Sequence, residues 1–122
     1  MQTFKDLKVW QKAHNLVLTI YKVTRKFPTE EKFGLTSQLR RAAISIASNI
    51  VEGFKRKTKN DSLHFYTISE GSLEEVKYQT LLAKDLGYFP KQTYEEITAN
   101  AEEIGRMLCG FKKAISQPKI LV

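Results

Sequence analysis

The sequence predicts an all-α protein, an antiparallel up-down-up-down bundle of four helices. Apolar residues recur at spacings of three and four along most of the 122-residue chain. Only three prolines and six glycines interrupt it, and short loops between long helices favour a bundle. No stretch shows the period of two that is typical of β-strands. The length suits a single domain, residues 1–122, with helices at about 4–26, 36–56, 61–86 and 93–115.

The first predicted helix, 4–26, begins and ends at clear signals. Thr3 can cap its start, Asp6 lies in its first turn, and Pro28 ends it. Its apolar residues form two stripes: Leu7, Trp10, His14, Val17 and Tyr21 in one, and Val9, Leu16, Ile20 and Val23 in the other. We therefore expect this helix to carry more apolar surface than one neighbouring helix covers.

The second predicted helix, 36–56, is apolar or small over most of its circumference. On a helical wheel its apolar side chains from Leu39 to Val51 span an arc of about 200°. A helix that packs on one side only needs about half of that arc. We therefore expect this helix to be covered on two sides and the chain to assemble with copies of itself.

Turn and cap residues bound the remaining two helices. Asn60, Asp61 and Ser62 are candidate caps for the helix at 61–86, and Gly87 provides a left-handed stop. For the helix at 93–115 we predict a capping box formed by Thr93 and Glu96. That last helix carries a coiled-coil-like seam of Tyr94, Ile97, Ala101, Ile104, Leu108, Phe111 and Ile115.

The turn between the second and third helices predicts how they meet. If it is centred near residue 58, the numbers of facing residues add up to about 117. The facing pairs are then Arg41 with Glu75, Ser45 with Ser72, and Ser48 with Ser69. We predict an ion pair of Arg41 or Arg40 with Glu75, and serine hydroxyls bonded to carbonyls of their own helix. This polar stripe either sets packing and register or forms a ligand site.

Charge is predicted to concentrate at one end of the bundle. The chain has 20 Lys and Arg against 13 Asp and Glu, a net charge of +7. The topology gathers ten cations at the end we name the basic pole: Lys5, Lys8, Lys12, Lys55, Arg56, Lys57, Lys59, Lys112, Lys113 and Lys119. The acidic residues there are Asp6, Glu52 and Asp61. The pole is either a phosphate-binding surface or a solvated end at which helix C-termini favour cations.

For binding a nucleic-acid backbone, the predicted residues are Lys55, Arg56, Lys57 and Lys59, with Lys8, Lys12, Lys112 and Lys113 as auxiliaries. Arg40 and Arg41 are predicted to be structural. Nearby aromatic residues either stack on bases or belong to the core: Phe54, Phe65 and Tyr66.

No catalytic, metal or cofactor site is predicted. His14 and His64 lie on different helices and have no zinc-ligand spacing, and Cys109 is expected to be a buried structural thiol. A single cysteine favours a reducing compartment. The first ten residues lack the apolar run of a signal peptide, and no membrane span is expected, so a cytoplasmic location is predicted.

Three segments resemble the 23S ribosomal RNA intervening sequence proteins: FKDLKVWQKAHNLVLTIYKVTRKFP, FGLTSQLRRAAISIASNIVEG and GSLEEVKYQTLLAKDLGY. The resemblance covers about Phe4 to Phe111. It implies a small bacterial protein whose antiparallel four-helix bundle forms a homopentameric ring. It also implies a relation to the accessory protein of diversity-generating retroelements, a basic barrel that binds a reverse transcriptase and nucleic acid. Glu70 departs from the family pattern, which has a small or basic residue there, and argues against nucleic-acid contact on its face.

These observations lead to two hypotheses for function. The first is a non-enzymatic homopentameric scaffold that binds RNA or DNA backbone through the basic pole. The alternative is a protein adaptor that recruits a nucleic-acid-processing enzyme such as a reverse transcriptase and has no direct nucleic-acid role. An enzyme or metalloprotein ranks below both.

Overall fold

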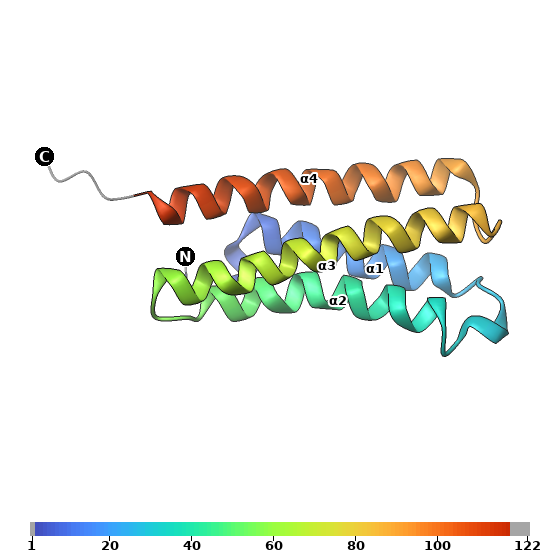
Figure 1. The fold of residues 1–122 in the computed structure, drawn as a ribbon, viewed down its shortest axis with the longest axis horizontal. Coiled ribbons are helices and arrows are strands. Elements are labelled where there is room, and N and C mark those ends of the chain that lie inside the picture. Colours follow the sequence, from blue (N-terminus) through green and yellow to red (C-terminus); the bar gives the residue numbers. More distant parts are fainter. Residues whose placement is uncertain (1, 118–122) are drawn as a thin grey trace, which may run out of the picture.

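The computed structural model describes residues 2–117, which form four α-helices and no strand (Figure 1). The helices are α1 (Lys8–Thr24), α2 (Leu35–Phe54), α3 (Lys59–Asp85) and α4 (Lys91–Ser116). Short 3₁₀ turns at Phe4–Asp6 and Thr29–Glu31 precede α1 and α2. The predicted all-α class is therefore confirmed.

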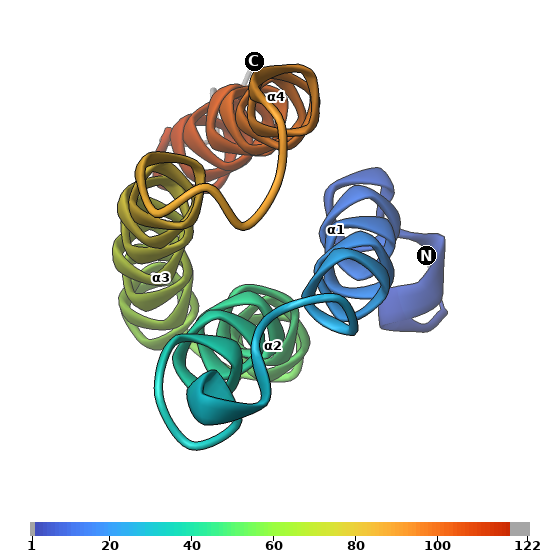
Figure 2. The ribbon, with the colours of Figure 1, turned by 90° about the vertical axis from the view of Figure 1, so that its right-hand side faces the viewer.

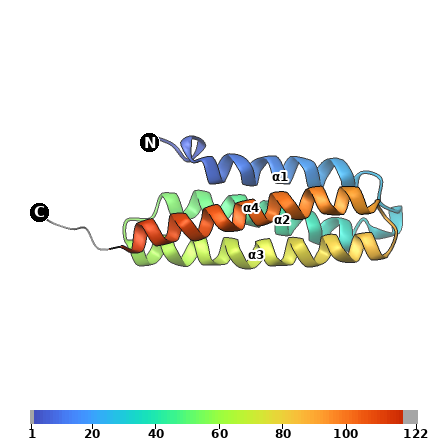
Figure 3. The same cartoon turned by 90° about the horizontal axis from the view of Figure 1, so that it is seen from above.

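The helices lie side by side around a common centre. Viewed end on, they follow the order α1, α2, α3, α4 (Figure 2), and α1 and α4 also touch. The α2–α3 turn lies at the same end of the molecule as the end of α4, whereas α1 begins slightly further back (Figures 1 and 3). The α1–α2 and α3–α4 connections lie at the other end.

The core is built from one face of each helix. The largest fully buried aliphatic residues are Leu16, Ile20, Leu39, Ile46, Ile50, Leu73, Val76, Ile97, Ile104 and Leu108. The wide apolar arc of α2 is covered within one copy, because α1 packs on one side of it and α3 on the other. This corrects the reasoning that the arc calls for a second copy. Ile44, at 39 % exposure, is the exposed large apolar residue of α2.

The first helix is shorter than predicted because Leu7 interrupts it. Thr3 and Asp6 form a capping box, but it closes the 3₁₀ turn and not α1. Leu7 is extended (φ −77°, ψ 119°), which turns its side chain into the core at 4 % exposure. At the other end α1 stops at Thr24, four residues before Pro28. A proline disfavours helical geometry in the residue before it, so the helix ends ahead of Pro28.

Two of the predicted caps are wrong and one stop is confirmed. Thr58 caps α3, its hydroxyl accepting from the Asp61 amide at 3.1 Å, so the helix starts earlier than its candidate caps suggested. Pro90 begins α4 without a side-chain cap, and its fixed φ starts the helix ahead of Thr93. Gly87 has φ +79° and ends α3 as predicted.

The predicted register between α2 and α3 is confirmed at its centre. The hydroxyls of Ser45 and Ser72 lie 2.7 Å apart, which is the pairing expected from a turn near residue 58. The next pairing differs: buried Ser69 donates to the carbonyl of Ile46 in α2 at 2.8 Å, while Ser48 faces solvent. A serine hydroxyl here links two helices and does not bond to its own.

The predicted Arg41–Glu75 ion pair is not formed. Both side chains line one shallow hollow with Ser45 and are exposed, and neither takes part in an ion pair within residues 2–117. Water solvates exposed charges well, so pairing them gains little. Arg40 turns to α1 instead, where its Nε donates to the Thr24 hydroxyl at 2.9 Å.

Candidate nucleic-acid interface

The α2–α3 turn, residues 55–58, is held in place by contacts at both of its ends. The Ser62 hydroxyl donates to the Gly53 carbonyl at 2.8 Å, across the turn. The Thr58 cap fixes the first turn of α3. Gly53 also approaches Tyr66 so closely that a Cβ there would lie 2.4 Å from the Tyr66 ring. The side chains of this turn therefore project from a fixed support.

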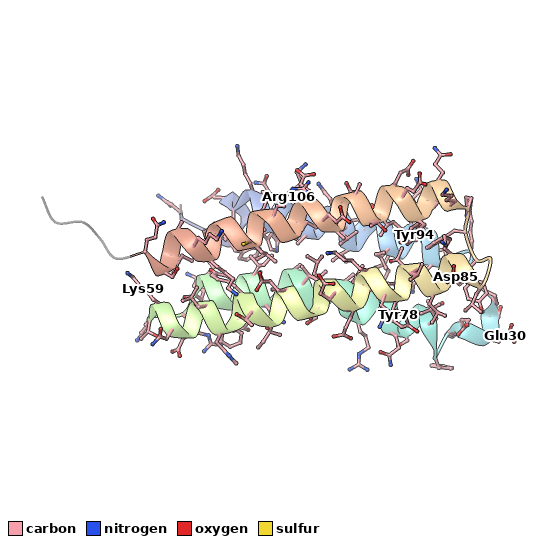
Figure 4. All side chains as sticks on the ribbon, turned by 45° about the horizontal axis from the view of Figure 1, so that its top comes forward. Glu30, Lys59, Tyr78, Asp85, Tyr94 and Arg106 are labelled. Carbon is pink, nitrogen blue, oxygen red and sulfur yellow. The ribbon has the colours of Figure 1, made fainter. Side chains whose placement is uncertain are left out.

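Four predicted binding residues lie together on this turn and at the first residue of α3, a cluster that we name the basic turn: Lys55, Arg56, Lys57 and Lys59. All four are exposed. Arg56 pairs with Glu52 at 2.7 Å, whereas the three lysines form no ion pair within the described residues. Figure 4 shows Lys59 at the end of the molecule opposite Glu30 and Asp85. The basic turn is therefore an exposed cluster of positive charge with little local compensation.

The auxiliary lysines are less available. Lys12 pairs with Glu103 at 3.4 Å, which joins α1 to α4. Lys112 pairs with Glu70 at 2.6 Å, and its ammonium also donates to the Thr67 hydroxyl at 2.9 Å. Lys8 and Lys113 are exposed at the start of α1 and the end of α4. Lys119, also assigned to the basic pole, lies outside the described residues.

Two of the three aromatic residues near the pole, Tyr66 and Phe65, have different roles. Tyr66 is 1 % exposed and packs edge-on against Phe111, and burial raises the pKa of Tyr66 to about 12. It therefore belongs to the core. Phe65 is half-buried, and the Arg56 guanidinium lies 4.3 Å from its ring centroid. Sequence reasoning missed this contact, because Arg56 lies within the turn and its direction depends on the conformation of the turn.

The other reactive side chains do not form a site. His14 is exposed and stacks on Trp10, with ring centroids 5.0 Å apart. Cys109 is exposed, contrary to the expected buried thiol, because α4 turns Leu108 into the core. Within residues 2–117 no group of His, Cys, Asp and Glu side chains is arranged to hold a metal ion. None of the helices in that range has the length and apolar character needed to cross a membrane.

Comparisons with known proteins identify the family. A family model described as 23S rRNA-intervening sequence protein matches residues 5–110. The fold is similar to the crystal structure of a protein of unknown function from the S23 ribosomal protein family of Bacteroides thetaiotaomicron VPI-5482. That likeness has a TM-score of 0.80 at 23 % identity and covers 86 % of this chain and 98 % of the other. A search of curated proteins gives no match. The chain belongs to the family of 23S rRNA-intervening sequence proteins.

Proposed function

We propose that this protein is a non-enzymatic, homopentameric scaffold that binds the phosphate backbone of RNA or DNA through the basic turn. In this proposal the antiparallel bundle closes with four further copies into a ring. The observation that carries the binding role is the cluster of four exposed cations on an α2–α3 turn that is held by contacts at both of its ends. A fixed support matters because binding then costs little backbone ordering.

The seam on the outer side of α1 and α2 supports self-assembly. There the Arg40 guanidinium lies 4.4 Å from the ring centroid of Tyr21. If α1 and α2 run in opposite directions, the residue one turn before Tyr21 lies level with the residue one turn after Arg40. These two residues are Val17 and Ile44. Val17 is half-buried, Ile44 is 39 % exposed and neighbouring Leu18 is 55 % exposed. A second copy packing on this seam removes that apolar surface from water. The number five follows the family resemblance.

Phosphate binding follows from the chemistry of the lysines. Each ammonium on the basic turn is a point charge on a flexible stem, which suits phosphate contacts without sequence readout. Closing five copies into a ring repeats the turn and strengthens the positive field. Because each phosphate contact releases counterions, affinity should fall steeply as salt rises.

The test is the salt dependence of binding to a labelled single-stranded oligonucleotide, followed by fluorescence anisotropy. The triple variant Lys55→Gln, Arg56→Gln, Lys57→Gln removes three charges from the basic turn. Its matched control removes three exposed charges from the opposite end of the molecule, at Lys22, Arg25 and Lys26. Both variants have the same net charge, so only the position of the lost charge differs.

We expect the basic-turn variant to reduce the slope of log K against log salt by about 1.4–2, since each single-strand contact contributes about 0.7 and Arg56 is already paired with Glu52. The control should leave the slope close to that of the wild type. Equal slopes in the two variants would mean that net charge alone drives binding, and the site assignment would then be rejected.

A second candidate is the protein adaptor that recruits a nucleic-acid-processing enzyme. The observation that favours it lies at the end opposite the basic turn, where Phe33 is 89 % exposed and Leu86 is 50 % exposed. Aromatic side chains such as Phe33 are enriched in protein interfaces. Capture from a nuclease-treated lysate separates the two functions. A partner retained by the wild type and lost with Phe33→Ser favours the adaptor, and loss of all partners after nuclease favours direct binding.

A further inference from the structure

We propose that Arg56 is a stacking plate for a nucleobase, which makes the basic turn a site for single-stranded nucleic acid. This inference rests on the proposed function and names its substrate class. It assigns Arg56 a role different from that of the three lysines around it.

Two contacts hold the guanidinium group of Arg56 in place, one with Phe65 and one with Glu52. Its central carbon lies over the Phe65 ring, 4.3 Å from the ring centroid. One terminal nitrogen donates to Glu52 Oε2 at 2.7 Å, which holds an edge. The side chain is still 41 % exposed. We infer that the face of the guanidinium away from Phe65 receives the base, and little side-chain entropy is lost when a base stacks on a group already held in place.

The ion pair with Glu52 separates the role of Arg56 from that of the lysines. Its charge is already partly compensated, so it is a weaker phosphate ligand than an unpaired lysine. Lys55, Lys57 and Lys59 form no ion pair within the described part of the chain. The lysines hold phosphates, and the guanidinium face receives the base between them.

Stacking selects for single strands. In a duplex both faces of each base are already stacked on neighbouring bases, so none is free to lie on Arg56. In a single strand the bases can turn outward and stack on aromatic rings or guanidinium planes. His64 is exposed next to this position, and its ring stands edge-on to Phe65, with the ring centroids 5.5 Å apart.

The experiment compares two single-stranded probes of about 12 nucleotides, a length in the range of single-strand binding sites. One is oligothymidine and the other is an abasic oligomer with the same number of phosphates. We expect the wild-type protein to bind oligothymidine about tenfold more tightly, the low-to-middle range for stacking one base. Because stacking releases no counterions, this advantage should persist at every salt concentration.

Two variants test the plate itself. Arg56→Lys keeps the charge but loses the plane, and it should remove most of the advantage of oligothymidine while leaving the salt slope unchanged. Phe65→Leu removes the supporting ring and should reduce the advantage as well. Arg25→Lys, the same chemical change at an exposed site on the opposite end, should have no effect.

The outcomes distinguish this inference from the function on which it rests. If the wild-type protein binds both probes equally well, stacking is overturned while backbone binding stands. If neither probe binds, the proposed function itself fails. If the Arg56→Lys variant keeps the full preference for oligothymidine, the bases stack on another residue and the role proposed for Arg56 is wrong.

Discussion

Replacing Gly53 by alanine should destabilise the bundle at the contact that positions the basic turn. Gly53 lies in the last turn of α2, where a Cβ atom would be 2.4, 2.8 and 2.9 Å from three ring carbons of Tyr66. Real Cβ atoms are essentially never found closer than 3.0 Å to such neighbours. The Tyr66 ring cannot easily move away, because it is 1 % exposed and packs against Phe111 at a centroid distance of 5.1 Å.

The size of the effect follows from two opposing contributions. Forcing an extra methyl group into a packed site costs about 1–3 kcal/mol, and contact with three ring atoms favours the upper end. Alanine gains about 1 kcal/mol over glycine inside a helix. The net loss should be about 2 kcal/mol. Gly71 is the matched control, since a Cβ there meets nothing within 4 Å, and Gly71→Ala should stabilise by up to about 1 kcal/mol.

The assay is urea denaturation followed by circular dichroism at constant protein concentration. Combining Gly53→Ala with Tyr66→Leu should recover part of the loss, because the ring that meets the new methyl group is gone. The reasoning is refuted if Gly53→Ala is as stable as the wild type, or if its loss is the same in the Tyr66→Leu background.

Two further predictions concern assembly and acid stability. A pentamer of 14.0 kDa chains has a mass of about 70 kDa, and Ile44→Glu should lower the mass in solution below this value. Ile68→Glu makes the same change at a similarly exposed residue of α3 and should leave the mass unchanged. Light scattering after size exclusion checks both, and an unchanged mass for Ile44→Glu would remove the α1–α2 seam as the interface. The Tyr88 hydroxyl donates to Glu31 at 2.6 Å and holds the pKa of that carboxyl below its usual 4.5. The contact therefore stabilises the folded protein above pH 4.5, and this stabilisation is lost as the pH falls further and Glu31 takes up a proton. Tyr88→Phe should therefore have a lower Tm than the wild type at pH 7 and a smaller difference below pH 4; a gap that stays constant across this range would contradict the assignment.

Features set by local chemistry could be predicted from the sequence. The helices follow from apolar spacing, and the stop at Gly87 follows from its freedom to adopt positive φ. The Ser45–Ser72 contact follows from the position of one turn and the geometry of two helices. The seam of α4 turned inward as its spacing indicates, with Ile97 and Leu108 buried.

Features that depend on the folded conformation of particular side chains could not be predicted. Leu7 leaves the first helix because the core offers it a buried position, a tertiary effect that outweighs helix propensity. Lys112 was assigned to phosphate binding, but the bundle brings Glu70 within 2.6 Å of it. The candidate site was predicted as a set of charges, whereas the stack of Arg56 on Phe65 required the conformation of the turn.

The most direct test of the basic turn as a nucleic-acid interface is ultraviolet cross-linking of a single-stranded oligonucleotide to the wild-type protein. Trypsin digestion and mass spectrometry then locate the attached nucleotide. We predict that it is found mainly on the peptide of residues 60–77, which carries His64 and Phe65. Attachment mainly to the peptide of residues 33–40, at the opposite end of the molecule, would contradict the proposal.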